Sequence, residues 1–434
     1  MRFSILLCAA LLNAQSAPSG DAFLLKGATV HTLAGPVIEN GSILIRDGKI
    51  LGVGKNLTAP DGVRVIDITG QQVYPGMIDA ASTIGLNGPA EQPGASDVKE
   101  LGDLNPQLRA FTAVNPDAEQ IPMSRASGVT SAIVFPDGEL IPGQLSLIHL
   151  DGSNNDAMTI LPAAAIHLRF PIIATMRVWQ HEAKADDEDP RDAVAYKPLP
   201  YPEAKREHDR QIKELNSFFD QARRYRHAKL ANAKDLKTDL RFEAMLPVLD
   251  GTMPVFVTAV REREIREAIA FAGKQKIKII LADAAEAYKL LSLIKSRNIP
   301  VVLQPTLSLP LDDDDPYDRA YTTPADLYKA GIKFAIATFS SDSVRNLPSQ
   351  AAAAVAFGLT PEEAYKAVSL NVAEIFGVSK RLGSIEEGKT ADLIVTSGDP
   401  LDARTRVTQV FINGKPVDLD TRQKELYEKY RKRP

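Results

Sequence analysis

The second half of the chain alternates short apolar runs with helical segments, and this alternation restricts the fold more than any other feature. The apolar runs are PVFVTAV, KIKIILAD, IPVVLQP and IKFAIATFS, the first beginning at Pro254 and the last ending at Ser340. The segments between them place apolar residues at i, i+3 and i+4, as in REREIREAIAFAGKQ. Nearly continuous apolar strands joined by amphipathic helices are typical of buried parallel sheets. The sequence therefore predicts an α/β fold, a (β/α)8 TIM barrel over residues 74–384.

The two ends of the chain have a different pattern, which predicts short strands and tight turns. Residues 22–73 contain the pair Asp47-Gly48 and residues 385–420 contain Asn413-Gly414, and both pairs are strong hairpin signals. Each segment is too small to bury a core alone, so we expect the two to form one composite β-sandwich domain. Residues 421–434 are expected to form a C-terminal helix or tail.

The first sixteen residues have the pattern of a secretory signal peptide. Arg2 is followed by an apolar run over residues 5–12 and by Ala14-Gln15-Ser16, which predicts cleavage near Ala17 and an exported protein, periplasmic or extracellular. The one cysteine, Cys8, lies inside this segment, so the mature chain would have no disulfide, thiolate nucleophile or sulfur-ligated zinc. No other segment approaches 18 uninterrupted apolar residues, so we expect no membrane partner. A formal net charge of −4 gives no electrostatic reason to expect nucleic-acid binding.

A charged region interrupts the barrel pattern between residues 177 and 240. It begins with a polar loop and continues as a charged helix predicted over residues 203–234. Two interpretations remain open for this helix. It is a solvated helix covering the side of the barrel, or it is a lid or a surface for a partner.

Four segments, in this order along the chain, resemble the amidohydrolase superfamily. They are GATVHTLAGPVIENGSILIRDGKILGVG, VYPGMID, RNLPSQAAAAVAFGLTPEEAYKAVSLNVAEIFGV and LGSIEEGKTADLIVTSGDPLDARTRVTQVFINGKPV. The resemblance is to the exported branch related to imidazolonepropionase. It implies a metal-centred barrel with a composite β-sandwich, and hydrolysis of C–N bonds other than peptide bonds.

The resemblance also implies zinc or another divalent metal, held by an H-x-H pair, two further histidines and an aspartate at the ends of barrel strands. Such a metal lowers the pKa of bound water to about 7. In this sequence the matching positions are occupied by Ala81, Thr83, Thr258 and Phe339, and the sixth-strand position falls at Asp283 or Ala284. The fourth-strand ligand has no evident counterpart. Residues 228–434 contain no histidine, so we expect no metal cofactor and expect Phe339 to fill the vacated space.

Other side chains are weaker candidates for catalysis or binding. His149 and His167 alternate with apolar residues on strands, so each is either an acid or base pointing into the barrel or a satisfied core histidine. Asp342, with Arg345, follows the eighth strand, where it lines a pocket or caps a helix. Asp283 follows the sixth strand.

Two further groups of aspartates have a structural and a functional interpretation. Asp79 is expected to hold a structural hydrogen bond rather than a metal. The run of aspartates over residues 312–315 would attract calcium or form a solvated loop at the barrel mouth.

Three functions from different classes remain. The first is a non-catalytic amidohydrolase-like protein that binds a small-molecule ligand or an intact relative. The second is a working C–N hydrolase that uses Asp283, Asp342 and a histidine from the first half of the chain. The third is a structural subunit. We expect an oligomer in either of two forms, a homo-oligomer or a hetero-oligomer with a catalytically intact relative.

The signal pattern makes one direct prediction. Protein purified from the native exported fraction should begin near Ala17, and intact-mass measurement checks this. A mass that retains Met1 would show that the apolar segment is not removed.

Overall fold

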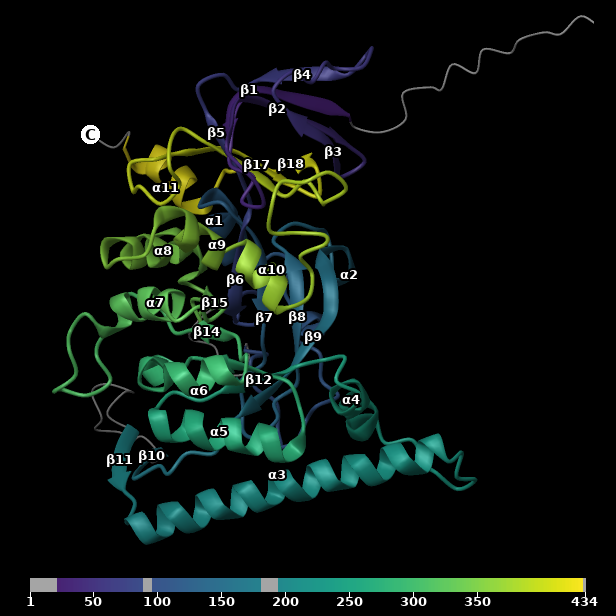
Figure 1. The fold of residues 1–434 in the computed structure, drawn as a ribbon, viewed down its shortest axis with the longest axis vertical. Coiled ribbons are helices and arrows are strands. Elements are labelled where there is room, and N and C mark those ends of the chain that lie inside the picture. Colours follow the sequence, from purple (N-terminus) through teal and green to yellow (C-terminus); the bar gives the residue numbers. More distant parts are fainter. Residues whose placement is uncertain (1–21, 89–95, 181–193, 432–434) are drawn as a thin grey trace, which may run out of the picture.

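The computed structural model describes residues 22–88, 96–180 and 194–431 (Figure 1). The predicted signal peptide, residues 1–16 with Cys8, lies outside the described residues, so cleavage and export stay predictions. No helix in the described ranges is long and apolar enough to cross a bilayer.

The larger sheet has eight strands in the order β15-β14-β13-β12-β9-β8-β7-β6 and curls into a nearly closed barrel. This confirms the predicted mixed α/β fold with a barrel-like sheet. The strands are β6 (Met77–Ser82), β7 (Val129–Val134), β8 (Gln144–His149), β9 (Thr159–Arg169), β12 (Val255–Thr258), β13 (Ile279–Ala282), β14 (Val301–Leu303) and β15 (Phe334–Ile336).

The first half of this barrel departs from the regular (β/α)8 repeat. Strand β8 runs antiparallel to both neighbours. Its residue His149 lies opposite Ser131 of β7, and its residue Leu145 lies opposite Ala165 of β9. The connections on either side of β8 are short, and the second holds only α2 (Asn155–Met158). A parallel pair needs a crossover of a dozen or more residues, whereas an antiparallel pair does not. The predicted repeat is therefore wrong for this half of the barrel.

Helices of the second half pack outside the strands that they connect (Figure 1). Helix α5 (Glu262–Gln275) buries the stripe that its spacing predicts, including Ile265, Ile269 and Ala272. The others are η3 (Ala285–Leu290), α6 (Leu291–Ser296), α7 (Arg319–Lys329), η4 (Val344–Asn346), α8 (Leu347–Ala356), α9 (Pro361–Ala367) and α10 (Leu370–Ile375). Two helices lie between β6 and β7: η1 (Ala110–Ala113) and α1 (Gln120–Ala126).

The two ends of the chain form a second eight-stranded sheet, in the order β18-β17-β16-β5-β1-β2-β3 with β4 beside β1. Strand β16 pairs antiparallel with β5, which joins the terminal segments directly. A sandwich of two separate sheets stays a prediction. The strands are β1 (Phe23–Val30), β2 (Ile38–Arg46), β3 (Lys49–Gly54), β4 (Arg64–Asp67), β5 (Gln72–Pro75), β16 (Leu393–Thr396), β17 (Val407–Ile412) and β18 (Lys415–Pro416).

Both predicted hairpin turns are present in this small sheet. Asp47 and Gly48 have φ of 51° and 75°, and Asn413 and Gly414 have φ of 50° and 70°. Positive φ at both central residues is the requirement of a type I′ turn, which explains the Asp-Gly and Asn-Gly pairs. The turn residues also meet in space, since a Cβ added at Gly48 would lie 2.7 Å from Asn413 Oδ1.

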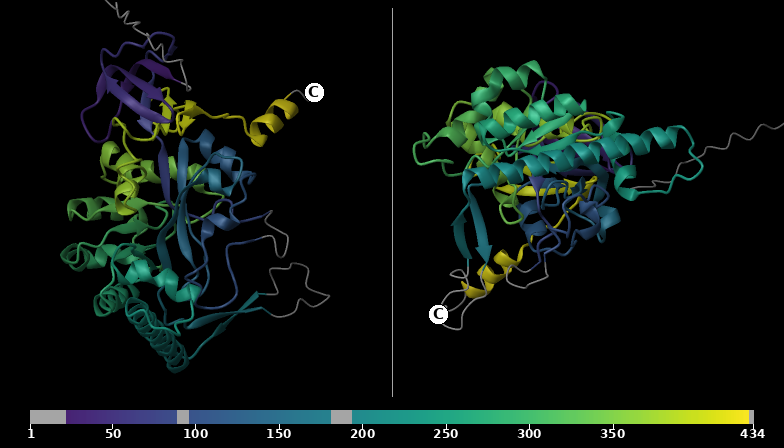
Figure 2. Two further views of the ribbon diagram at one scale, coloured as in Figure 1. Left: turned by 90° about the vertical axis from the view of Figure 1, so that its right-hand side faces the viewer. Right: turned by 90° about the horizontal axis from the view of Figure 1, so that it is seen from below.

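The long charged helix α3 (Tyr201–Leu230) lies across α4 (Leu240–Leu249) and α5 on the outside of the barrel (Figures 1 and 2). Its inward face buries apolar residues such as Leu215, Phe218 and Phe219. Its outward face carries ion pairs one turn apart, among them Arg210 with Glu207 and Glu214. This arrangement fits the predicted solvated covering helix. The helix is preceded by the hairpin of β10 (Met176–Gln180) and β11 (Val194–Pro198), and α11 (Arg422–Tyr430) follows the small sheet at the C-terminal end.

Asp79 closes the barrel between its first and last strands. Its Oδ1 accepts hydrogen bonds from the N–H of Ala81 at 3.2 Å and of Thr338 at 3.1 Å, and its Oδ2 lies against Thr338 Oγ1. The N–H of Phe339 adds a bond of 2.8 Å to the carbonyl of Ala81. The structural role expected for Asp79 fits these contacts. Burial raises the pKa of Asp79 to about 7, against the hydrogen bonds, which lower it.

The closure predicts different effects for two variants of Asp79. Asp79→Ala removes three hydrogen bonds and leaves the Thr338 groups unsatisfied, so it should reduce the free energy of unfolding by about 3 kcal/mol. Asp79→Asn keeps an oxygen for the two N–H groups and offers an N–H to Thr338 Oγ1, so it should fold. Urea denaturation of both variants measures the difference.

The raised pKa gives Asp79→Asn a second readout. The proton on folded Asp79 favours folding fully below the unfolded pKa, and this contribution is lost as the pH rises through about 7. The urea midpoint of the wild type should therefore fall more between pH 5 and pH 7.5 than that of Asp79→Asn. Parallel pH profiles would contradict the assignment.

Candidate functional site

A pocket of about 800 Å³ opens at the C-terminal ends of β9, β12 and β13. Arg169, Thr258 and Asp283 come from these strand ends, and Glu207 with Gln211 come from α3, which forms the outer wall. The carboxyl ends of parallel barrel strands are where active sites of this architecture lie. The pocket is therefore the candidate functional site.

His167 lies beneath this pocket and is fully engaged by its neighbours. Its Nδ1 is 2.7 Å from the carbonyl oxygen of Pro136, and its Nε2 is 2.9 Å from Thr258 Oγ1. A carbonyl only accepts, so Nδ1 carries the proton and Nε2 accepts from the Thr258 hydroxyl. Burial lowers the pKa of His167 to about 4. Of its two predicted roles, the geometry matches the satisfied core histidine.

Three phenylalanine rings occupy the barrel interior beside His167. Phe339 packs edge-on against Phe135, with ring centroids 5.7 Å apart, and lies 6.5 Å from Phe256. Phe135 and Phe256 also contact the imidazole, at 5.5 and 5.9 Å. Phe339 is half-buried and has a φ of 51°. The predicted filling ring is thus present, but its burial is partial.

The positions at which the resemblance places metal ligands do not offer a ligand set in this structure. Ala81 is fully buried and has no donor atom, and Thr83 Oγ1 accepts from Asn87 Nδ2 at 3.4 Å. Thr258 donates to His167, and Phe339 has no donor atom. Zinc sites need imidazole, carboxylate or thiolate ligands. The side chains at these positions therefore do not fit the metal that the resemblance implies.

Asp283 is the candidate carboxylate that the structure places in the pocket. It follows β13 with a φ of 58°, a backbone conformation that aspartate tolerates better than most residues. Burial raises the pKa of Asp283 to about 6, and the nearby charge of Arg169 acts in the opposite direction. A carboxyl group with such a pKa exchanges a proton near neutral pH.

His149 and Asp342 do not join this site. Because β8 is antiparallel, its last residue His149 lies at the other end of the barrel, 3.3 Å from Asp392 Oδ2 beside the small sheet. Asp342 is exposed, accepts from Gln120 Nε2 at 3.0 Å and is not among the residues that line the pocket. Arg345 is exposed as well. Of the predicted combination, the structure therefore places Asp283 in the pocket and His167 beneath it, and a catalytic role for these residues stays a prediction.

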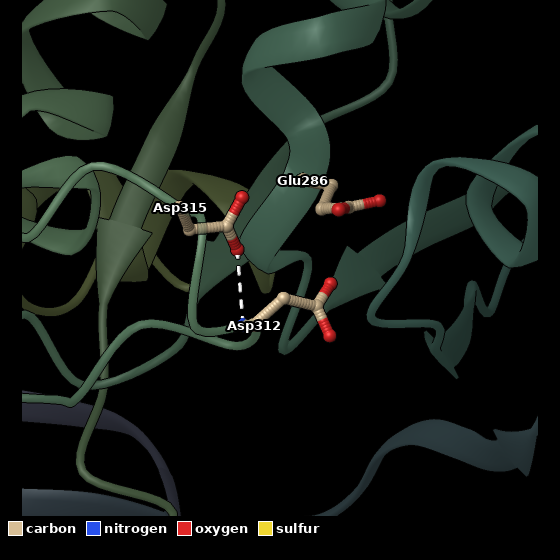
Figure 3. A group of neighbouring side chains, drawn as sticks. All are labelled: Glu286, Asp312 and Asp315. Atoms are coloured by element: carbon tan, nitrogen blue, oxygen red, sulfur yellow. Dashed lines mark hydrogen bonds between the residues drawn. The ribbon is translucent and has the colours of Figure 1, made fainter.

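Figure 3 shows a cluster of three carboxylates, Glu286, Asp312 and Asp315, whose oxygens lie within 4.8 Å of one another. Asp312 forms a two-pronged pair with Arg261, including a bond of 2.9 Å from Nη2 to Oδ1. Glu286 pairs with Lys289 at 2.7 Å. Asp315 accepts from the N–H of Asp312 at 3.2 Å. Two of the three carboxylates are thus paired with cations, the aspartate run lies in the predicted loop, and calcium binding there stays a prediction.

Arg169 is a pocket residue that the sequence interpretation missed. Its Nη1 lies 3.3 Å from Asp137 Oδ1 and 3.3 Å from the carbonyl of Gly138, and its side chain is half exposed. The sequence did carry a signal for this residue, because Arg169 is the charged residue next to the end of the apolar run AAAIHLRF. A charge at the carboxyl end of a barrel strand favours a functional role.

The ring cluster predicts a moderate cost for Phe339→Asp. Loss of ring contacts should cost about 2 to 3 kcal/mol, and relief of the positive φ should return about 1 kcal/mol. We expect a lower melting temperature for Phe339→Asp than for wild type, with Phe339→Asn between them because it adds no charge. A melting temperature equal to wild type would show that the ring contributes nothing.

Comparison with known proteins agrees with the fold and with the sequence resemblance. The profile described as "Amidohydrolase family" matches residues 319–417. The amidohydrolase tasK of Hapsidospora irregularis is 24% identical over 409 residues, which cover 86% of this chain and 39% of that protein. The chain therefore spans well under half of that relative. The imidazolonepropionase of Flavobacterium johnsoniae is 35% identical over 95 residues, 21% of this chain and 23% of the enzyme.

One solved structure extends the similarity to nearly the whole chain. An amidohydrolase from Thermotoga maritima aligns with a TM-score of 0.77 and 28% identity, over 91% of this chain and 99% of its own. The profile, by contrast, covers only the region from α7 to β18. The order of segments, the barrel and these relatives agree with one another and support the assignment of the chain to the amidohydrolase superfamily.

Proposed function

We propose that this protein binds a polar small molecule in the pocket under α3 and does not carry out the metal-dependent hydrolysis of its superfamily. The observation that supports this most is the bond between His167 Nε2 and the Thr258 hydroxyl, at the strand ends where a metal would be held. Both imidazole nitrogens are already engaged, so His167 has no lone pair to offer a cation.

The ring cluster supports the same proposal from the other side of the barrel. Phe339, with Phe135 and Phe256, lies where a developing negative charge would need donors or a metal. Aromatic edges and faces do not replace such groups. On this proposal, packing of the rings occupies the place of the metal chemistry that the resemblance implies, while the pocket above it is lined by Asp283 and Arg169.

The ligand would carry both hydrogen-bond donors and hydrogen-bond acceptors. Asp283 accepts when ionised and donates when protonated, and the guanidinium of Arg169 has N–H groups beyond the Nη1 that faces Asp137. A pocket volume of about 800 Å³ is within the range for drug-sized ligands.

A second candidate function rests on Asp283. A half-buried carboxyl group whose pKa is raised to about 6 by burial has the property of a general acid or base. In that case the protein hydrolyses a C–N bond with Asp283 activating water, and without a bound metal. The relatives named amidohydrolase and imidazolonepropionase favour this reaction class.

Export and association are part of the proposal and rest on the sequence. The protein would act outside the cytoplasm, alone as an oligomer or with an intact relative. The outer face of α3 is charged and internally paired, so it gives no apolar surface for that association.

Metal analysis distinguishes metal-dependent hydrolysis from the two functions proposed above, ligand binding and metal-free hydrolysis by Asp283. After dialysis, purified protein should hold far less than one zinc, manganese or iron per chain, because the four matching positions lack ligands. The double variant Ala81→His with Thr83→His should gain no hydrolysis, since two imidazoles leave the site incomplete. Roughly one tightly bound metal per wild-type chain would overturn the proposal.

A thermal-shift screen of N-acyl amino acids and ureas separates binding from hydrolysis. A ligand of the pocket should raise the melting temperature of wild type and of Asp342→Asn, the matched control outside the pocket, but not of Asp283→Asn. Recovery of the compound intact supports binding. Its cleavage by wild type and not by Asp283→Asn would establish the second candidate instead.

A further inference from the structure

A second pocket, of about 660 Å³, lies at the junction between the small sheet and the barrel helices. One wall is the loop over residues 31–37 after β1, and the opposite wall is the start of α9 with Tyr328 from α7. Figure 1 shows α9 in the part of the barrel nearest the small sheet, with α7 farther from that sheet. The junction pocket shares no lining residue with the pocket under α3.

The floor of the junction pocket is a stack of three rings. His31 lies parallel to Tyr74, with ring centroids 4.0 Å apart and planes 7° apart, and Tyr74 packs on Tyr365 at 4.8 Å. The Tyr365 hydroxyl donates to the carbonyl of Pro75 at 2.7 Å, which fixes the lowest ring. Tyr328 adds a fourth ring, 45% exposed, at the mouth.

The hydrogen bonds of the stack leave one acceptor on His31. Gln72 Oε1 receives the Tyr74 hydroxyl at 2.7 Å and lies 3.0 Å from His31 Nε2, so Nε2 carries a proton and donates. Burial lowers the pKa of His31, which keeps the ring neutral near pH 7. Nδ1 of His31 is then an unprotonated acceptor with no partner among the described residues.

The charges of the lining all have one sign. Glu362, Glu363 and Asp399 line the junction pocket, and no lysine or arginine of the described chain is among its lining residues. Lys366 lies behind the first two and pairs with both, at 2.7 and 3.0 Å. Asp399 accepts from the N–H of Leu401 at 2.9 Å and has no cationic partner in the described ranges. Burial raises the pKa of Tyr74 and of Tyr365, and the charge of Asp399 raises both further, so Asp399 lies close enough to act on these rings.

We propose that this junction pocket binds an organic cation of the alkylammonium class, with Asp399 as its main charged contact. Aromatic rings and carboxylates around one cavity are complementary to a positive charge that carries apolar carbon. A metal ion is less suited because two of the three carboxylates are already paired with Lys366. An anion would meet three carboxylates. A bound cation would contact the small sheet and the barrel helices together, and would therefore stabilise their junction.

Choline and its uncharged isostere 3,3-dimethylbutan-1-ol test the proposal, since they differ in charge and hardly in shape. Isothermal titration calorimetry on the full mature chain should show saturable binding of choline, at least about ten-fold tighter than the alcohol. Choline should also raise the melting temperature. Equal affinities for the two probes, or no binding of choline, would overturn the proposal.

Variants identify the residues involved. Asp399→Asn keeps an acceptor for the Leu401 N–H and should weaken choline binding about ten-fold, while Asp61→Asn removes an exposed charge of the small domain outside the pocket and should not. Tyr328→Leu, at an exposed position, should weaken binding about three-fold without unfolding the chain. Unchanged affinity in Asp399→Asn would refute the assignment, and so would equal losses in Asp399→Asn and Asp61→Asn.

Discussion

The carboxyl group of Asp79 is the interaction on which the barrel depends. It joins β6 to Thr338, which lies 259 residues later at the end of the last strand. The described strands β6 and β15 share no continuous ladder, so this group and the bond from Phe339 N–H to Ala81 supply the link. An open sheet edge at this point would leave backbone groups without partners. A side chain with two acceptor oxygens satisfies several of them at once.

The same closure fixes what occupies the barrel interior. It holds Phe339 with a positive φ beside Ala81, and from there the ring reaches Phe135 and Phe256. These rings flank His167, whose pKa is lowered by burial and whose two ring nitrogens are satisfied by Pro136 and Thr258. Buried polar groups are stable when each has a partner, and here each partner is another residue of the chain.

The carboxylates of the barrel mouth are distinguished by their partners. Asp312 is neutralised by Arg261, and Glu286 by Lys289, so neither is free for a ligand. Asp283 lines the pocket under α3, where burial raises its pKa. Asp399 lines the junction pocket, and neither of its oxygens pairs with a cation of the described residues. Position at a cavity and the absence of a compensating charge, rather than the number of acidic residues, determine which carboxylates are available for binding.

Much of the architecture follows from the sequence, because it depends on local chemistry. Apolar runs and helical spacing predicted the barrel-like sheet, and the Asp-Gly and Asn-Gly pairs predicted two turns. The absence of histidine from residues 228–434 excludes imidazole ligands on the later barrel strands. Those features need only the periodicity and donor atoms of neighbouring residues.

The tertiary structure decided the features that depend on the direction of a strand and on contacts between residues far apart in the sequence. Whether β8 runs up or down sets which end of the barrel His149 occupies, and nothing in its apolar alternation encodes that choice. Asp283 follows β13 and Asp342 follows β15, yet only Asp283 lines the pocket whose walls include α3 and Arg169. The stack of His31, Tyr74 and Tyr365 joins residues up to 334 positions apart in numbering. Sequence spacing fixes a residue's element and face, whereas contacts between elements fix its neighbours and hence its charge state.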